Sequence, residues 1–225
     1  HLTVAETGWG KASWGKIYGQ WLCGCGVMVY DFDIFSPEKL LKVIEDFKVT
    51  SFCAPPTVYR YFIKKDMKKF DLSHLEHITT AGEALNPEVF EQVHKQTGLQ
   101  IMEGFGQTES VLMLGNLVGS TAKIGSLGKP TPLYNIMIAD NEGNRLPANE
   151  VGEIVVIPSE NQHGIFMGYC GNEDLYANVW KYGIYHTGDT AYMDDDGYYW
   201  YVGRIDDLIK TRGYRVGPFE IENVL

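Results

Sequence analysis

A run of seven residues, Glu103–Glu109, brings together side chains that suit a nucleotide. The ring of Phe105 can stack on a purine base, and the hydroxyl of Thr108 can donate a hydrogen bond to a phosphate oxygen. The carboxylate of Glu109 suits Mg²⁺, which prefers oxygen ligands and is often held by one or two carboxylates together with substrate phosphates. Two glycines in the run let the backbone approach a ligand closely. The run therefore predicts an ATP site.

The same residues also fit a structural role without a ligand. A glycine turn could end at Thr108 as the N-cap of a helix, with Glu109 near the positive end of the helix dipole. From the run alone, both interpretations stay open.

The charge distribution marks a second region. The chain has a formal net charge of −10, which argues against binding to nucleic acid or to anionic membrane surfaces. From Arg204 to Arg215, however, there are four cations and two anions. An anionic ligand could bind there, although charge alone favours a solvated pair of strands.

The composition indicates a folded protein with a sizeable core. Of the 225 residues, 44% are apolar, which is enough for one large domain or two small ones. No apolar run is long enough to predict a membrane span, and the first residues lack the pattern of a secretory signal. The cysteines are too scattered for a disulfide framework, so we expect reduced thiols and a cytoplasmic location. They are Cys23, Cys25, Cys53 and Cys170.

The first half of the chain predicts an α/β fold. Apolar periodicity and capping signals alternate between strands and helices. We expect strands over 27–30, 49–54, 77–80 and 99–102, and helices over 9–22, 37–47, 57–66 and 87–97. Such alternation is typical of a parallel sheet with helical crossovers. Because ligands bind beyond the carboxyl ends of parallel strands, Gly82-Glu83 and Gly104–Glu109 could line one site.

The second half predicts a smaller antiparallel, barrel-like β subdomain. We expect strands over 136–138, 152–157, 185–193 and 198–202. The acidic turn Asp194–Gly197 would close a hairpin, and it lacks the spacing of an EF-hand calcium loop.

Three parts are expected along the chain. They are a truncated α/β subdomain over 1–120, a β-rich subdomain over 121–205, and a hinge with the start of a C-terminal domain over 206–225. Residues 218–225 begin a predicted helix. We interpret the chain as a piece of a longer protein.

Six stretches resemble the motifs of one enzyme superfamily, in that superfamily's order. They are Ala81–Leu85, Gly104–Glu109, Gly125–Pro130, Gly152–Ile154, Tyr185–Asp189 and Gly203–Arg215. The chain is thus similar to the adenylate-forming superfamily of acyl-CoA synthetases, luciferases and peptide-synthetase adenylation domains. Thr7-Gly8-Trp9, residues 54–60 and Gln107 look most like medium-chain acyl-CoA synthetases. The resemblance implies a fragment of the large N-terminal domain of such an enzyme.

The resemblance implies a two-step reaction with ATP, Mg²⁺ and coenzyme A. A carboxylic acid would attack the α-phosphate of ATP, which gives an acyl-adenylate and pyrophosphate. Coenzyme A would then displace AMP and form a thioester. Other members of the superfamily load an amino acid or aryl acid onto a carrier thiol, and a third alternative is a non-catalytic nucleotide-binding module.

Roles at the adenine base follow from the resemblance. Gly82, Glu83 and Ala84 would lay backbone against one adenine face, with Phe105 near the other. Glu103 would accept a hydrogen bond from the adenine amino group.

Roles at the ribose and the phosphates follow in the same way. The implied catalytic residues are Thr108, which would bind phosphate, Glu109, which would hold Mg²⁺, and Lys210. Asp189 would accept hydrogen bonds from the ribose hydroxyls, a task suited to an ionised carboxylate. Arg204 would approach the ribose or the phosphates. As an alternative, Asp189 is a hairpin residue bonded to nearby backbone.

The last residues resemble the superfamily's hinge and coenzyme A loop. Asp206 matches the hinge about which the C-terminal domain rotates, although a turn aspartate would look the same. Gly213 and Tyr214 match the loop that lines the pantetheine tunnel. Lys210 and Arg215 are the charged members of that loop, and plain surface exposure fits them equally.

The resemblance also bears on the acyl pocket and on two motifs of the superfamily. Gly106 leaves room for an acyl group longer than acetate. Trp9, Trp14 and Trp21 could line the acyl pocket, although core packing is the commoner role of such aromatic residues. The superfamily's phosphate loop and its C-terminal catalytic lysine are not found in the sequence, so we expect the 225-residue piece to have little ligase activity.

Overall fold

The computed structural model describes residues 1–160, 163–207, 209–211, 214–216 and 221. The chain divides into two compact units, unit 1 (His1–Val111) and unit 2 (Leu112–Leu225). The functional subdivision expected at residues 120 and 205 stays a prediction. None of the described helices is long and apolar enough to cross a membrane.

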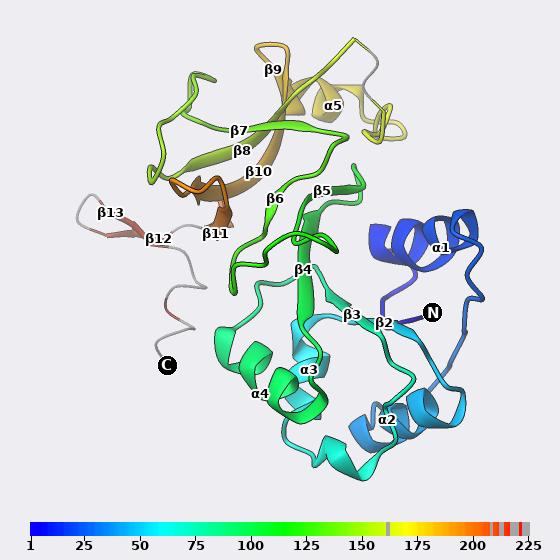
Figure 1. Cartoon of the computed structure of the whole chain (residues 1–225). Helices are drawn as coiled ribbons and strands as arrows, with labels where there is room; N and C mark the ends of the chain where they lie inside the picture. The colour runs from blue at the N-terminus through cyan, green and yellow to red at the C-terminus, as the bar shows by residue number, and fades with distance from the viewer. Residues whose placement is uncertain (161–162, 208, 212–213, 217–220, 222–225) are drawn as a thin grey trace. The chain divides into compact units, whose positions relative to one another are not determined.

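Unit 1 contains the predicted parallel sheet. Its strands β1 (Leu2–Thr3), β2 (Ser51–Cys53), β3 (His77–Thr80) and β4 (Ile101–Gly106) pair side by side in that order, all parallel (Figure 1). Because neighbouring residues of a strand point to opposite faces, one face carries the buried side chains. These are Leu2, Phe52, Ile78 and Ile101.

Three helices pack against that face. They are α2 (Pro37–Asp46), α3 (Pro56–Phe62) and α4 (Pro87–Thr97), and Figure 1 shows them grouped on one side of the strands. A short 3₁₀ turn, η2 (Met67–Lys69), links α3 to β3. Each helix contributes apolar residues to a single core, so the predicted α/β fold is confirmed.

Capping residues place these helices where the sequence predicts. Ser36 accepts a hydrogen bond from the backbone N–H of Lys39 at the start of α2, and Asn86 accepts one from Glu88 at the start of α4. Gly98 ends α4 in the left-handed conformation, with φ +77°, as helix-terminating glycines commonly do.

The first predicted helix is present but is unusual in form. Its first part, η1 (Lys11–Tyr18), is a π-helix, and a single α-turn, α1 (Gly19–Leu22), follows. The N–H of Gly19 bonds to the carbonyl of Trp14, five residues earlier, and a Cβ at Gly19 would lie 2.5 Å from that carbonyl oxygen. A glycine there therefore permits the wider turn.

The strand predicted over 27–30 is wrong. Met28 forms only an isolated bridge with Leu2, and Val29 is 78% exposed. The first strand of the sheet is instead β1, which has two residues. Its brevity leaves no alternating pattern for the sequence to show.

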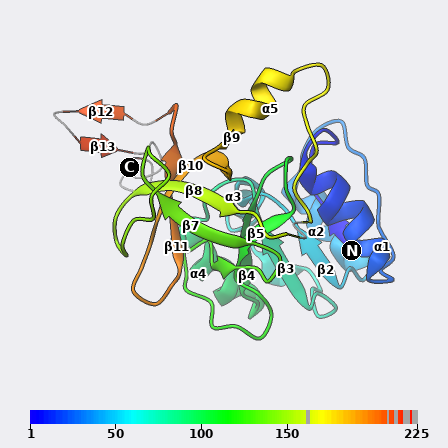
Figure 2. The same ribbon diagram turned by 90° about the horizontal axis from the view of Figure 1, so that it is seen from above.

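Unit 2 is antiparallel, as predicted. A four-strand path runs β11 (Tyr199–Arg204), β10 (Ile184–Met193), β8 (Gly152–Ile157), β7 (Asn135–Ala139), and β9 (Trp180–Lys181) pairs with β10. Figure 2 shows these strands curling alongside one another. The remaining elements are β5 (Leu112–Gly115), β6 (Lys129–Pro130), α5 (Glu173–Val179), β12 (Ile209–Thr211) and β13 (Tyr214–Val216). Apart from Ile221, the helix predicted over 218–225 lies outside the described residues.

Candidate functional site

The two predicted nucleotide stretches of unit 1 follow neighbouring parallel strands. Thr80, the last residue of β3, pairs with Glu103 of β4. Glu103, Phe105 and Gly106 belong to β4 itself, so the loop is shorter than the sequence indicates. No helix begins at Thr108, because the next element is a strand. The alternative role of Thr108 as a helix N-cap is therefore wrong.

The segment that enters η1 contacts both stretches. The backbone N–H of Gly10 donates to the Thr108 hydroxyl at 3.3 Å, and the ammonium of Lys11 donates to the carbonyl oxygen of Ala81. A Cβ at Gly10 would lie 3.0 Å from the Thr108 Cα atom. Close approach thus favours glycine at this position, and three segments distant in sequence meet beyond the ends of β3 and β4.

Lys11 is a functional candidate that the sequence analysis missed. Burial lowers the pKa of its ammonium, while the nearby Cys53 and Glu83 act to raise it. Glu83 is itself bonded to the Thr57 hydroxyl at 2.7 Å. A partly desolvated cation at the end of a parallel strand is well placed to attract an anionic ligand. The only sequence signal was its position two residues after Trp9.

Glu103 is buried, with 3% of its surface exposed. Its Oε1 atom accepts a hydrogen bond of 3.0 Å from the backbone N–H of Leu85, whereas Oε2 has no hydrogen-bond partner in the described part of the chain. Burial raises the pKa of Glu103 to about 8, although the Leu85 bond acts against this. An orphaned buried oxygen needs an explanation, and a ligand donor is one.

The other predicted residues of this group lie in accessible places. Gly82 and Glu83 are exposed, Gly82 with φ +99°, and Phe105 and Glu109 are half-buried. The described residues hold no cluster of three or more metal-binding side chains.

In unit 2 the structure brings Asp189 and Arg204 together. They are directly opposed in the β10–β11 pair, and their side chains form an ion pair at 3.5 Å. Asp189 is 5% exposed and also accepts from the Tyr201 hydroxyl at 3.3 Å. Burial and the Asp189 carboxylate raise the pKa of Tyr201. The Asp189 carboxylate therefore has the side chains of Arg204 and Tyr201 as partners, whereas the alternative prediction gives it nearby backbone.

Asp206 continues this network. Its Oδ1 atom accepts from Nε of Arg204 at 3.2 Å, and its side chain is 73% exposed. One arginine thus links a buried aspartate to an exposed one just beyond the end of β11. The hinge role of Asp206 stays a prediction.

The predicted coenzyme A loop is described only in part. Lys210 pairs with Arg215 in the small β12–β13 sheet, next to the pair Thr211 and Tyr214. Gly213 lies outside the described residues, as do the side chains of the other predicted loop members.

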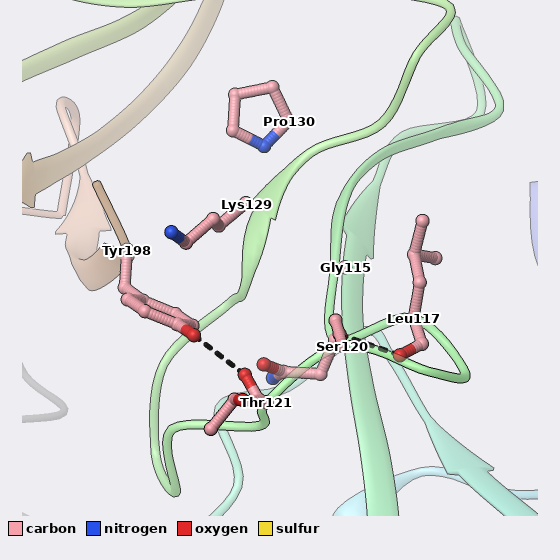
Figure 3. A pocket seen from close by; sticks show the side chains of 8 residues that line it. Gly115, Leu117, Ser120, Thr121, Lys129, Pro130 and Tyr198 are labelled. Atoms are coloured by element: carbon pink, nitrogen blue, oxygen red, sulfur yellow. Dashed lines mark hydrogen bonds between the residues drawn. The ribbon is translucent and has the colours of Figure 1, made fainter. Parts of the chain in front are cut away.

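Each unit also has a hollow. In unit 2, one of about 280 Å³ lies between the 115–121 segment, β6 and Tyr198. Figure 3 shows Lys129 extending toward the Tyr198 ring, whose hydroxyl donates to the Thr121 carbonyl at 2.6 Å. No predicted site residue lines it. In unit 1, a hollow of about 220 Å³ is lined by Trp9, Tyr30 and other residues.

The predicted site residues thus form two local groups. In unit 1 the group surrounds the ends of β3 and β4, and in unit 2 it surrounds the Asp189–Arg204 pair. That both groups act on one nucleotide stays a prediction.

Comparison with known proteins identifies similar chains. The family model described as "AMP-binding enzyme" matches residues 9–170. The chain is 42% identical over 224 residues to acyl-coenzyme A synthetase ACSM3, mitochondrial, of Mus musculus, covering 99% of this chain and 38% of that protein. It is 41% identical over 227 residues to 4-hydroxybutyrate–CoA ligase 1 of Metallosphaera sedula, covering 100% and 40%.

A solved structure agrees with these relatives. The anthranilate CoA ligase AuaEII, crystallised with anthranoyl-AMP, matches with a TM-score of 0.90 at 30% identity, over 99% of this chain and 42% of that one. The chain spans about two fifths of the length of the curated relatives it matches.

Proposed function

The chain belongs to the AMP-binding enzyme family, and on this premise we propose that the protein containing it is an ATP-dependent carboxylate–CoA ligase, an acid–thiol ligase. The observation that carries the proposal is the meeting of three segments beyond the ends of β3 and β4. There, the Lys11 ammonium, the Thr108 hydroxyl and an orphaned carboxyl oxygen of Glu103 gather within one unit.

At the base and phosphates, each group would bind a matching part of ATP. Oε2 of Glu103 lacks a partner and would meet the adenine amino group. Gly82, Glu83 and Ala84 would lie on one face of the base, with Phe105 near the other. Thr108 would donate to a phosphate oxygen.

Glu109 would hold Mg²⁺ together with the phosphates. The bound cation would neutralise phosphate charge. Lys11, whose ammonium is partly desolvated, would add positive charge on the same side. In unit 2, Asp189 would accept from the ribose hydroxyls, and Arg204 would hold that carboxylate and approach the phosphates.

The chemistry then follows in two balanced steps. A carboxylate oxygen of the acid attacks the α-phosphorus, the bond to the pyrophosphate oxygen breaks, and acyl-adenylate forms. Coenzyme A first loses its thiol proton to solvent, its thiolate sulfur attacks the acyl carbonyl carbon, and AMP leaves with the electron pair of the broken C–O bond. Coenzyme A would be recognised by Gly213, Tyr214 and Arg215, with Lys210 as an additional catalytic residue and Asp206 as the hinge.

We propose a fatty acid of medium or longer chain as the substrate. Trp9, Trp14 and Trp21 are 45%, 48% and 62% exposed, so they lie at the surface of unit 1 and not in its core. Trp9 also lines the hollow of about 220 Å³. Gly106, at the end of β4, adds no side chain that would fill an adjoining acyl pocket.

The cellular location of the protein is also a matter of proposal. A cytoplasmic location stays our expectation, whereas the mouse relative is named as a mitochondrial protein.

The test uses the full-length protein that carries this chain. Incubation with ATP, Mg²⁺, coenzyme A and fatty acids of rising length should release AMP and acyl-CoA, both separated by chromatography. E109Q and D189A should each lower the rate roughly tenfold or more, while the exposed controls E88Q and D174A should not. Absence of AMP with every acid tested would contradict the proposal.

A further inference from the structure

We propose that Glu153 is a positioning residue that fixes the direction of Asp189. The Gly152–Ile154 and Tyr185–Asp189 motifs are adjacent in the β8–β10 pair, yet the proposed mechanism gives Glu153 and His186 no role. The inference rests on the proposed ribose role of Asp189.

Strand β10 is irregular just before Asp189. His186 pairs with Val155 of β8 and Thr190 pairs with Glu153, so four steps along β10 correspond to two steps along β8. The additional residues form a bulge, a feature that re-aims side chains near functional sites. Bulged residues lose their regular strand partners, so the N–H of Gly188 needs another acceptor.

The carboxylate of Glu153 supplies that acceptor. Its Oε1 atom accepts from the N–H of Gly188 at 2.8 Å, and its Oε2 atom lies 2.7 Å from Nδ1 of His186. A carboxylate only accepts hydrogen bonds, which assigns the imidazole proton to Nδ1. One side chain thus spans the bulge and bonds to both of its sides.

The conformation that Glu153 holds is specific. Gly188 has φ +73°, and a Cβ there would lie 3.0 Å from Nη2 of Arg204. Arg204 donates to the carbonyl of Thr187 at 3.3 Å, and the Thr187 hydroxyl accepts from the N–H of Asp189 at 3.1 Å. The turn that Glu153 bonds therefore leads directly into Asp189 and also accepts a hydrogen bond from its ion-pair partner, Arg204.

Two other contacts hold the rest of the bulge. The Thr187 hydroxyl donates to the Ile154 carbonyl at 2.7 Å, and the N–H of Ile205 donates to the Gly188 carbonyl at 2.9 Å. Loss of the Glu153 carboxylate should therefore leave the sheet paired and free only the N–H of Gly188 and Nδ1 of His186. A Glu153 variant therefore tests the position of Asp189 without a general loss of fold stability.

The first measurement is hydrogen exchange in the full-length protein, read by mass spectrometry on overlapping peptides that isolate Gly188. In E153A the Gly188 amide should exchange roughly tenfold faster. In the control E150Q, which changes an exposed glutamate three residues earlier, it should be unchanged. Unaltered exchange in E153A would contradict the assigned contact.

The second measurement compares the affinities for AMP and 2′,3′-dideoxy-AMP. Wild type and E150Q should bind AMP roughly tenfold more tightly than 2′,3′-dideoxy-AMP, because only AMP has the ribose hydroxyls that reach Asp189. In E153A the two affinities should become nearly equal. If E153A does not fold, E153Q carries the test: its amide presents N–H groups to His186, so the ratio should fall at least about threefold.

The outcomes distinguish the two levels of the proposal. A wild type that binds both nucleotides equally would overturn the ribose role of Asp189, and this inference with it. A wild type that discriminates, together with folded Glu153 variants that discriminate equally well, would overturn this inference alone.

Discussion

In unit 1, the candidate residues lie at or beyond the ends of parallel strands, and main-chain atoms contact two of them: the N–H of Gly10 donates to Thr108, and the carbonyl of Ala81 accepts from Lys11. In unit 2, Asp189 lies within strand β10, where the side chains of Arg204 and Tyr201 contact it, and the Glu153 side chain bonds to the preceding residue, Gly188. The first arrangement leaves groups open to a ligand. The second fixes the orientation of the Asp189 carboxylate, which a substitution of Glu153 could change.

The largest predicted difference between the units is in the unfolding free energy lost when a glycine is replaced by alanine. Gly128 in unit 2 has φ +86°, and a Cβ there would lie 2.1 Å from the carbonyl carbon of Gly115. Gly82 in unit 1 has φ +99°, but its Cβ would meet only Nζ of Lys11, at 3.5 Å. We expect G128A to cost about 4 kcal/mol of unfolding free energy and G82A about 1 kcal/mol. Urea unfolding of both variants measures this, and equal losses would remove the distinction.

A second prediction sharpens the account of unit 1 through pH. The pKa of Glu103 is about 8 in the folded chain, because burial raises it from its ordinary value of 4.5. The folded state therefore holds a proton that the unfolded chain releases, and stability should fall as pH rises between these values. From pH 5 to pH 8, wild type should lose about 3 kcal/mol more than E103Q, whose side chain is neutral throughout. Parallel stability profiles of the two proteins would contradict the assignment.

The smallest expected effects come from helix N-caps. Ser36 caps α2, which buries Leu40, Leu41 and Ile44, whereas Asn172 caps α5, which buries no residue. S36A should lower the unfolding free energy by about 1 kcal/mol. N172A should lower it by less than about 0.5 kcal/mol, because fraying of α5 exposes no core. Thermal unfolding of the two variants compares them directly, and a larger loss in N172A would refute this ranking.

The sequence predicts most of the fold because capping and periodicity are local signals. Ser36, Asn86 and Gly98 mark helix ends that the structure reproduces. Strand β1 is not predicted because its two residues are too few to show an alternation of apolar and polar side chains. Residues 27–30 mislead because an apolar run shows nothing of whether a neighbouring strand is available.

The residues of the candidate site likewise fall into those that the sequence reveals and those that only the structure reveals. Motif residues such as Thr108 and Asp189 can be named from the resemblance of their stretches to the superfamily's motifs. Lys11 could not, because its significance arises from a contact with Ala81 across 70 residues. The link between Glu153 and Gly188 likewise depends on an irregular strand register, which sequence periodicity does not encode.

The most direct test of the account asks whether both groups act on one nucleotide. Hydrogen exchange of the full-length protein, followed as AMP is titrated, reports on peptides that span residues 104–109 and 186–204. Both sets should become protected with the same half-saturating AMP concentration. Protection of one set alone, while AMP is bound, would contradict the central claim.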